Sequence, residues 1–134
     1  MKVNNVTNWI VIDRQASSLF NEIADGTFKN TTAGKDEWKS LINGSSLQEN
    51  CNKEGYNFHK GHSDVESGFI YMKIRIGIVA NNQNDCDTPN TCIGFGISAR
   101  GCHIYARNTT CGNLAICGWF NNTNTAAFGF ILVQ

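Results

Sequence analysis

The stretch from Gly68 to Gly96 constrains the fold more than any other part of the sequence. Between Phe69 and Ala80 apolar residues alternate with other side chains, which is the two-residue period of a strand with one buried face. The apolar side of this run carries Ile70, Met72, Ile74, Ile76 and Ile78. Lys73 and Arg75 fall on the other side, and the alternation returns at Ile93–Ile97. The stretch therefore predicts two neighbouring strands joined by a polar loop.

The loop between these strands, Asn81–Asn90, is rich in Asn and Asp and contains the only proline of the chain. Calcium prefers oxygen ligands, so we expect Asp85, Asp87 and Asn90 to hold a calcium ion. Two carboxylates predict weak binding, in the range of extracellular calcium modules. The alternative is a solvated turn, because Asn and Asp are common in turns for backbone reasons alone.

The bulk properties exclude several classes of function. The 134 residues fit one domain, 1–134, and a net charge of zero argues against nucleic acid or an anionic membrane as the partner. No apolar run has the length of a membrane span. The sequence also lacks a Gly-x-Ser-x-Gly elbow, a phosphate loop and a His-Glu-x-x-His helix, so we expect no enzyme.

Six cysteines and no Cys-x-x-Cys pair favour a disulfide framework over a zinc site. They are Cys51, Cys86, Cys92, Cys102, Cys111 and Cys117. Among the fifteen possible connectivities, short loops favour Cys86–Cys92 and Cys111–Cys117, which leaves Cys51 with Cys102.

Glycosylation signals also indicate an extracellular protein. Five Asn-x-Ser/Thr sequons begin at Asn5, Asn30, Asn43, Asn108 and Asn121. Together with the cysteines they predict a secreted or ectodomain glycoprotein whose leader is not part of this sequence.

The rest of the chain predicts short strands and two small helices. Trp9–Asp13, Leu114–Phe120 and Ala126–Val133 are strand candidates, and the last is apolar on both sides, which is typical of a buried strand. Helical spacing runs from Ala16 to a stop at Gly26, over two to three turns, and recurs between Gly34 and Gly44. The fold class predicted is α+β, a β-dominated antiparallel sheet with two short helices.

The histidines of the remaining polar segment show no specific pattern of a metal or catalytic site. We interpret Ser45–Ser67 as irregular, and His59 and His62 as exposed loop residues rather than a metal pair, although Asp64 and Glu66 follow them. His103 directly follows Cys102, and adjacent residues in a strand point to opposite faces, so a Cys-His nucleophile pair is not expected.

Motifs spread over nearly the whole chain resemble the C-terminal part of secreted fibrinogen-like domains of coral and sea-anemone type. The stretches that carry the resemblance are Asn8–Leu19, Trp38–Ile42, Asn50–Gly55, Ile74–Ile78, Ile93–Gly96, Thr110–Asn113 and Gly129–Gln134. Several proteins of that type belong to the organic matrix of coral skeletons. The resemblance implies a fibrinogen-related fold in an extracellular setting.

The second half is also similar to the intelectins, or X-type lectins, which bind calcium and exocyclic diols of sugars. Those proteins place a Cys-Ile-Gly-Gly-Gly run after the ligand loop and then a Cys-Gly-Asp stretch. Here Cys92–Gly96 follows Asp87–Thr91, and Cys111–Asn113 comes later. The resemblance implies a calcium-dependent lectin in which Asp87 and Asn90 supply oxygen ligands.

Sugar sites combine hydrogen-bonding side chains with an aromatic platform. Trp119 lies beside the Asn121–Thr125 loop, and Tyr105 and Arg107 precede Cys111, at the end of the fold that carries the ligand in the families resembled. We therefore expect Tyr105, Arg107, Trp119 and Asn121 to bind carbohydrate. The alternative is that Trp119 is a core residue of a strand.

The expected function is that of a secreted domain that binds a glycan or glycoprotein with calcium. The alternative is a structural, matrix or adhesion module, homo-oligomeric, that has no defined small ligand.

Overall fold

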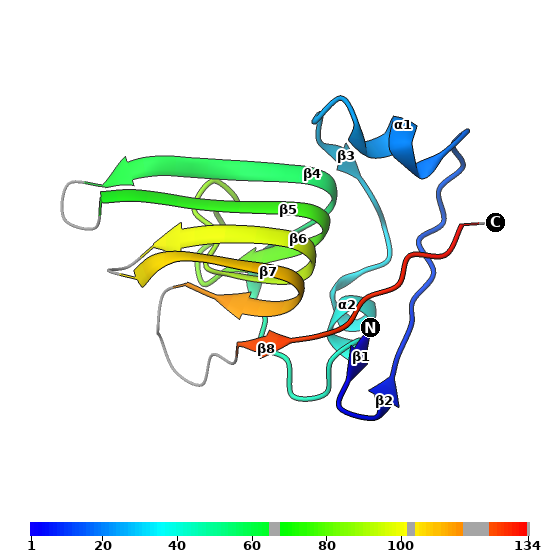
Figure 1. The fold of residues 1–134 in the computed structure, drawn as a ribbon. Coiled ribbons are helices and arrows are strands. Elements are labelled where there is room, and N and C mark those ends of the chain that lie inside the picture. The colour runs from blue at the N-terminus through cyan, green and yellow to red at the C-terminus, as the bar shows by residue number, and fades with distance from the viewer. Residues whose placement is uncertain (65–67, 102–103, 117–123, 134) are drawn as a thin grey trace.

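The computed structural model describes residues 1–64, 68–101, 104–116 and 124–133 of the chain. Within these ranges the chain forms eight strands and two short helices (Figure 1). Every strand pair is antiparallel. The prediction of a β-dominated antiparallel domain with two short helices is therefore confirmed.

Four long strands run side by side and curve round together at one end (Figure 1). They are β4 (Asn50–Asp64), β5 (Gly68–Asn81), β6 (Thr91–Gly101) and β7 (Ile104–Ala115). Two-residue strands lie at the edges of this six-stranded sheet of described residues, β3 (Lys29–Asn30) next to β4 and β8 (Thr125–Ala126) next to β7. Strands β1 (Lys2–Val3) and β2 (Val6–Thr7) form a separate hairpin. The sheet is a meander, because each strand in it pairs with the next along the chain.

Strand β4 is the largest difference from the sequence-based prediction, which treated Ser45–Ser67 as irregular. Its 15 residues pair with β5 along nearly their whole length. Three of its non-glycine residues, Cys51, Asn52 and Asn57, have positive φ, and the register shifts between Asn50 and Lys53. These irregularities hide the two-residue period of β4, and its pairing with the strongly alternating β5 imposes the strand.

The two helices begin at local signals. Helix α1 (Leu19–Ile23) starts after Ser18, whose Oγ accepts a hydrogen bond of 3.1 Å from the backbone N–H of Asn21. It is five residues long, which is shorter than the predicted two to three turns. Helix α2 (Lys35–Ser40) places Trp38 in the core. Neither helix within the described ranges has the length and apolarity needed to span a membrane.

A buried carboxylate ties α2 to the sheet. Glu54 of β4 is 7 % exposed and accepts hydrogen bonds from the Trp38 indole N–H at 2.6 Å and the Thr31 hydroxyl at 3.1 Å. The backbone N–H groups of Ala33 and Gly34 also donate to it, at 3.1 and 2.8 Å. Four donors satisfy the carboxylate oxygens, so the buried charge fixes the segment before α2 on the sheet.

Apolar side chains form two clusters that share the long strands. One contains Met72, Ile74 and Val79 of β5, and the other contains Ile76, Ile78 and Trp38. Ile74 and Val79 are five residues apart and would lie on opposite sides of a flat strand. Both nevertheless belong to one cluster, and Figure 1 shows that all four long strands are strongly curved.

A row of glycines crosses the sheet in the middle of this curve. Gly55 pairs with Gly77, Gly77 with Gly94, and Gly94 with Gly112, on β4, β5, β6 and β7. A Cβ added at Gly77 would lie 2.3 Å from the Ile93 carbonyl oxygen, and one added at Gly94 would lie 2.4 Å from that of Ile76. The row therefore admits no side chain, and the backbones approach closely at this point.

The curve divides the sheet into a covered half and an open half. Every residue of β5 from Ile76 to Asn81 is buried. Before Ile76 the strand alternates, with Met72 and Ile74 buried and Lys73 and Arg75 exposed. One face of the sheet is thus open to solvent in the half where β4 and β6 end and β5 and β7 begin.

Both terminal segments differ from their predictions. Trp9–Asp13 forms no strand, although Ile10 and Ile12 still pack on the core while Trp9 and Val11 are exposed. The prediction that Ala126–Val133 forms a buried strand is wrong. This segment pairs only at Thr125–Ala126 and through a bridge between Phe128 and Lys2, and no layer of the described chain covers its apolar side chains.

If the glycine row sets the curve, Gly77→Ala lowers the free energy of unfolding by about 3 kcal/mol, because the methyl group meets a backbone carbonyl. The matched control is Gly44→Ala, where an added Cβ meets nothing within 4 Å and only the φ of +73° is unfavourable, at a cost of about 1 kcal/mol. Urea denaturation of both variants measures the difference. If Gly77→Ala and Gly44→Ala lowered the free energy of unfolding equally, this role for the glycine row would be contradicted.

Candidate functional site

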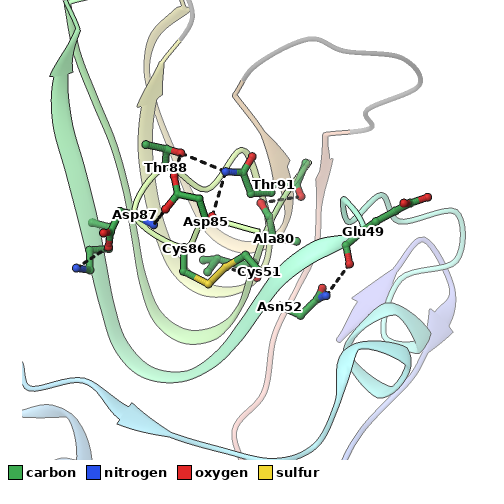
Figure 2. The surroundings of a disulfide bond; sticks show 12 residues. Glu49, Cys51, Asn52, Ala80, Asp85, Cys86, Asp87, Thr88 and Thr91 are labelled. Carbon is green, nitrogen blue, oxygen red and sulfur yellow. Dashed lines mark hydrogen bonds and ion pairs between the residues drawn. A yellow bond between two sulfur atoms is a disulfide. The ribbon is translucent and has the colours of Figure 1, made fainter. Parts of the chain in front are cut away.

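The disulfide framework differs from the predicted one. Cys51 is bonded to Cys86, which joins the start of β4 to the loop after β5 (Figure 2). The predicted pairs Cys86–Cys92 and Cys51–Cys102 are therefore wrong. The physical reason is the β4 register, since Asn50 lies opposite Asn81 and the irregular backbone at Cys51 turns towards the loop.

Two further cysteines are buried thiols among the described residues, where we had predicted disulfides. Cys92 is 0 % exposed and lies opposite Val79 in the core, and burial raises its pKa. Cys111 is 3 % exposed, and burial raises its pKa to about 11. The prediction that Cys111 is bonded to Cys117 is not met, and Cys102 and Cys117 lie outside the described residues.

The predicted calcium residues take part in a network within the loop itself. The Asp85 carboxylate accepts hydrogen bonds from the Asp87 N–H at 2.7 Å and the Thr88 hydroxyl at 2.5 Å (Figure 2). Asn90 donates through its amide to Asn81 Oδ1 at 2.9 Å. Asp87 instead forms an ion pair of 2.7 Å with Lys60 of β4. The three side chains therefore have separate partners, and no group of three His, Cys, Asp or Glu gathers within the described ranges.

The side chains of the predicted sugar-binding residues lie outside the described residues. Tyr105 and Arg107 belong to β7, and Arg107 lies opposite Ala99 of β6, but their side chains lie outside the described part. Trp119 and Asn121 lie outside it altogether. Of the predicted loop histidines, His59 is exposed as expected but belongs to strand β4, as does the backbone of His62.

A different set of residues gathers on the open half of the sheet. In register, His59 of β4 lies opposite Lys73 of β5, and Lys73 lies opposite Ser98 of β6. Two residues along β5, Tyr71 lies opposite Arg100 of β6. Residues opposite one another in a sheet share a face, so these side chains lie on the same side.

We name this surface the polar face; its members are His59, Tyr71, Lys73, Arg75, Ser98 and Arg100. The opposite side of the same strands is buried in the core, at Phe58, Met72, Ile74, Ile97 and Ala99. Successive rows of the polar face are spaced by about 7 Å along the strands and neighbouring strands by about 5 Å. The imidazole of His59, the ammonium of Lys73 and the guanidinium groups of Arg75 and Arg100 are therefore carried by neighbouring positions of one surface.

An open groove runs along one margin of the polar face. Its volume is about 290 Å³, and its lining is Gly26, Asn57, Phe58, His59, Lys73, Ile74, Arg75, Gly96 and Ser98. Asn57 donates to the backbone carbonyl of Thr27 at 3.1 Å, which holds the loop after α1 against the sheet as a wall of the groove. Within the described part of the chain, no carboxylate lines it.

Electrostatics on this surface favour an anion. Partial burial and, to a lesser degree, the neighbouring Lys73 ammonium lower the pKa of His59. The Lys73 ammonium lies 5.9 Å from the centre of the Tyr71 ring, and the Tyr71 hydroxyl is 3.3 Å from Ser98 Oγ. The face offers hydrogen-bond donors, positive charge and one aromatic ring, which is the chemistry for binding a polar ligand.

Part of this site was visible in the sequence. The alternation from Phe69 to Ala80 placed Lys73 and Arg75 on one side of a strand. His59 and Arg100 could not be assigned to the same surface without the strand register.

No family model, no curated protein and no solved structure matches this chain.

The thiol assignment predicts the outcome of alkylation. At about pH 8 the native protein leaves Cys92 and Cys111 unlabelled by iodoacetamide, because thiols with raised pKa carry little thiolate and both are buried. Unfolding without reductant exposes both to labelling, and a non-reducing peptide map shows Cys51 linked to Cys86. A peptide that links Cys86 to Cys92, or rapid labelling of the native protein, would contradict the assignment.

Proposed function

We propose that this chain is a secreted recognition domain that binds a carbohydrate or glycoprotein, of the fibrinogen-related type that its sequence resembles. The observation that carries the proposal is the polar face, where hydrogen-bond donors line an open groove and the Tyr71 hydroxyl contacts Ser98 at its margin. Sugars present hydroxyl groups and apolar ring faces together, and sites of this composition bind both.

Each part of the face has a role in this proposal. The Tyr71 ring supplies the platform for a sugar ring, and the Tyr71 and Ser98 hydroxyls donate to and accept from sugar hydroxyls. Arg107 and Tyr105 of β7 lie on the strand next to β6. The predicted sugar-binding residues Tyr105, Arg107, Trp119 and Asn121 remain a prediction from the sequence, since their side chains lie outside the described residues.

The disulfide is compatible with an extracellular location. Disulfides persist in oxidising compartments, and Cys51–Cys86 links β4 to the segment after β5 across a sequence separation of 35. We place the protein outside the cell on this ground together with the sequons.

Calcium dependence is part of the proposal. The loop after β5 offers oxygen atoms from Asn81, Asp85, Asp87 and Asn90, and the Asp87 carboxylate is exposed. A calcium ion there would compete with Lys60 for Asp87, so binding is expected to be weak.

A glycan array tests the proposal. The wild-type protein binds defined glycans, and Tyr71→Ala lowers the affinity about tenfold, since removal of the platform costs about 1.4 kcal/mol of contact energy. Trp9→Ala is the matched control, because Trp9 is an exposed aromatic residue outside the polar face. Repeating the array with EDTA and with Asp87→Asn measures the calcium dependence.

Absence of any glycan binding at millimolar calcium, or equal losses in Tyr71→Ala and Trp9→Ala, would refute the carbohydrate site.

One observation favours a second function, a structural or matrix module that associates with itself. Large apolar side chains are exposed along both terminal segments: Trp9, Val11, Phe128, Phe130, Ile131, Leu132 and Val133. The two segments meet where Phe128 bridges Lys2, and exposed apolar patches are typical of an interface.

If the matrix function applies, Leu132→Ser weakens self-association about tenfold, because Leu132 is 91 % exposed and its transfer out of water stabilises a contact by about 1.5–3 kcal/mol. Sedimentation velocity over a concentration series measures this, with Lys39→Ser as the exposed polar control. A wild-type protein that stays monomeric throughout the series would exclude this function.

A further inference from the structure

We propose that the ligand of the polar face is acidic, a glycan that carries carboxylate or sulfate groups. This inference rests on the proposed function and names its ligand class. The observation behind it is that the strand register gathers Lys73, Arg75 and Arg100, with His59 beside them, on one solvent-exposed surface.

The cations of this face have no acidic partner among the described residues. Among the described residues, the ion pairs are Arg14–Glu22, Lys29–Glu22, Lys29–Asp25 and Lys60–Asp87. All of them lie outside the polar face. The chain as a whole has 11 basic and 11 acidic residues. The positive charge of the face therefore comes from the local grouping of basic side chains and not from a basic composition.

Arg75 is held in place before any ligand arrives. Its Nη1 donates to Asn57 Oδ1 at 2.9 Å and to the Ile23 carbonyl at 3.4 Å. A guanidinium has five N–H donors, so several stay available for an oxyanion. Holding the side chain in advance lowers the entropy lost on binding, and the planar fork matches the two oxygens of a carboxylate or sulfate.

Glycines make room for the large side chains of the face. A Cβ added at Gly96 would lie 2.8 Å from the Cβ of Arg75, and one added at Gly61 would lie 2.8 Å from the Cβ of Tyr71. Gly96 also has a φ of +62°, which other residues rarely adopt. Each of these two side chains therefore has bare backbone beside it on one neighbouring strand, Arg75 at Gly96 of β6 and Tyr71 at Gly61 of β4.

A glycan fits these features better than a nucleic acid or a membrane. The net charge of zero gives no long-range attraction for an extended polyanion such as DNA or a membrane surface, so a ligand has to be bound by local contacts with the few cations of the polar face. The described part of the polar face has a single aromatic ring, whereas single-stranded nucleic acids are bound on several stacking platforms. The Cys51–Cys86 disulfide is compatible with an extracellular setting, where acidic polysaccharides are available.

The test compares acidic and neutral hexasaccharides by isothermal titration calorimetry. The probes are a heparin hexasaccharide, a hyaluronan hexasaccharide and neutral chitohexaose, with a single-stranded oligodeoxynucleotide and phosphatidylserine vesicles as competing polyanions. The protein is prepared without N-linked glycans, because Asn108 of a predicted sequon lies opposite Ser98 beside the polar face.

We expect at least one acidic hexasaccharide to bind more tightly than chitohexaose, with an affinity that falls as salt rises. Lys73→Gln and Arg100→Gln each weaken this binding about tenfold, as expected for the loss of one hydrogen bond to a charged group. Lys39→Gln, which removes an exposed cation from α2, leaves it unchanged. Circular dichroism and thermal unfolding of each variant confirm that the fold is retained.

The outcomes separate the inference from the proposed function. Binding of chitohexaose that is unaffected by Lys73→Gln and Arg100→Gln overturns the acidic ligand and leaves the carbohydrate-binding function standing. Absence of binding to every hexasaccharide overturns both. If the oligodeoxynucleotide or the vesicles bind more tightly than the acidic hexasaccharides, the acidic-glycan assignment is overturned. The same follows if Lys39→Gln lowers the affinity for the acidic hexasaccharide as much as Lys73→Gln and Arg100→Gln do.

Discussion

Close approach of four backbones at Gly55, Gly77, Gly94 and Gly112 is the constraint on which the rest of this structure depends. The paired glycines leave no room for a Cβ beside the neighbouring carbonyl groups, and Ile74 fills the space above two of them. The long strands curve there, so that Met72 and Ile74 from one half pack with Val79 from the other. The two halves of the meander thereby contribute to the same apolar cluster.

The curve also determines which part of the sheet is open to solvent. In one half, Trp38 and the buried Glu54 network attach α2 and the preceding segment to the strands. In the other half, the core covers only one side, and the strand alternation that buries Met72 and Ile74 exposes Lys73 and Arg75. The polar face is therefore a consequence of the same register that builds the core.

The sequence predicted those parts of the fold that a local pattern determines. The alternation in Phe69–Ala80 and Ile93–Ile97 gave β5 and β6, and the helical spacing placed both helices. Strand β4 was missed because its positive-φ residues and glycines break the period, and its partner strand specifies it. The disulfide and the polar face depend in turn on the β4 register, so Cys51–Cys86 and the pairing of His59 with Lys73 could not be derived from local spacing.

The central claim is that strand register builds an anion-binding surface on the open half of the sheet. Titration of ¹⁵N-labelled protein with a heparin hexasaccharide, followed by backbone amide chemical shifts, tests it most directly. The account predicts that the largest changes occur at His59, Lys73, Ser98 and Arg100, with little change from Asp85 to Asn90. Changes concentrated in that loop or at Trp119 and Asn121, with the four strand positions unaffected, would contradict it.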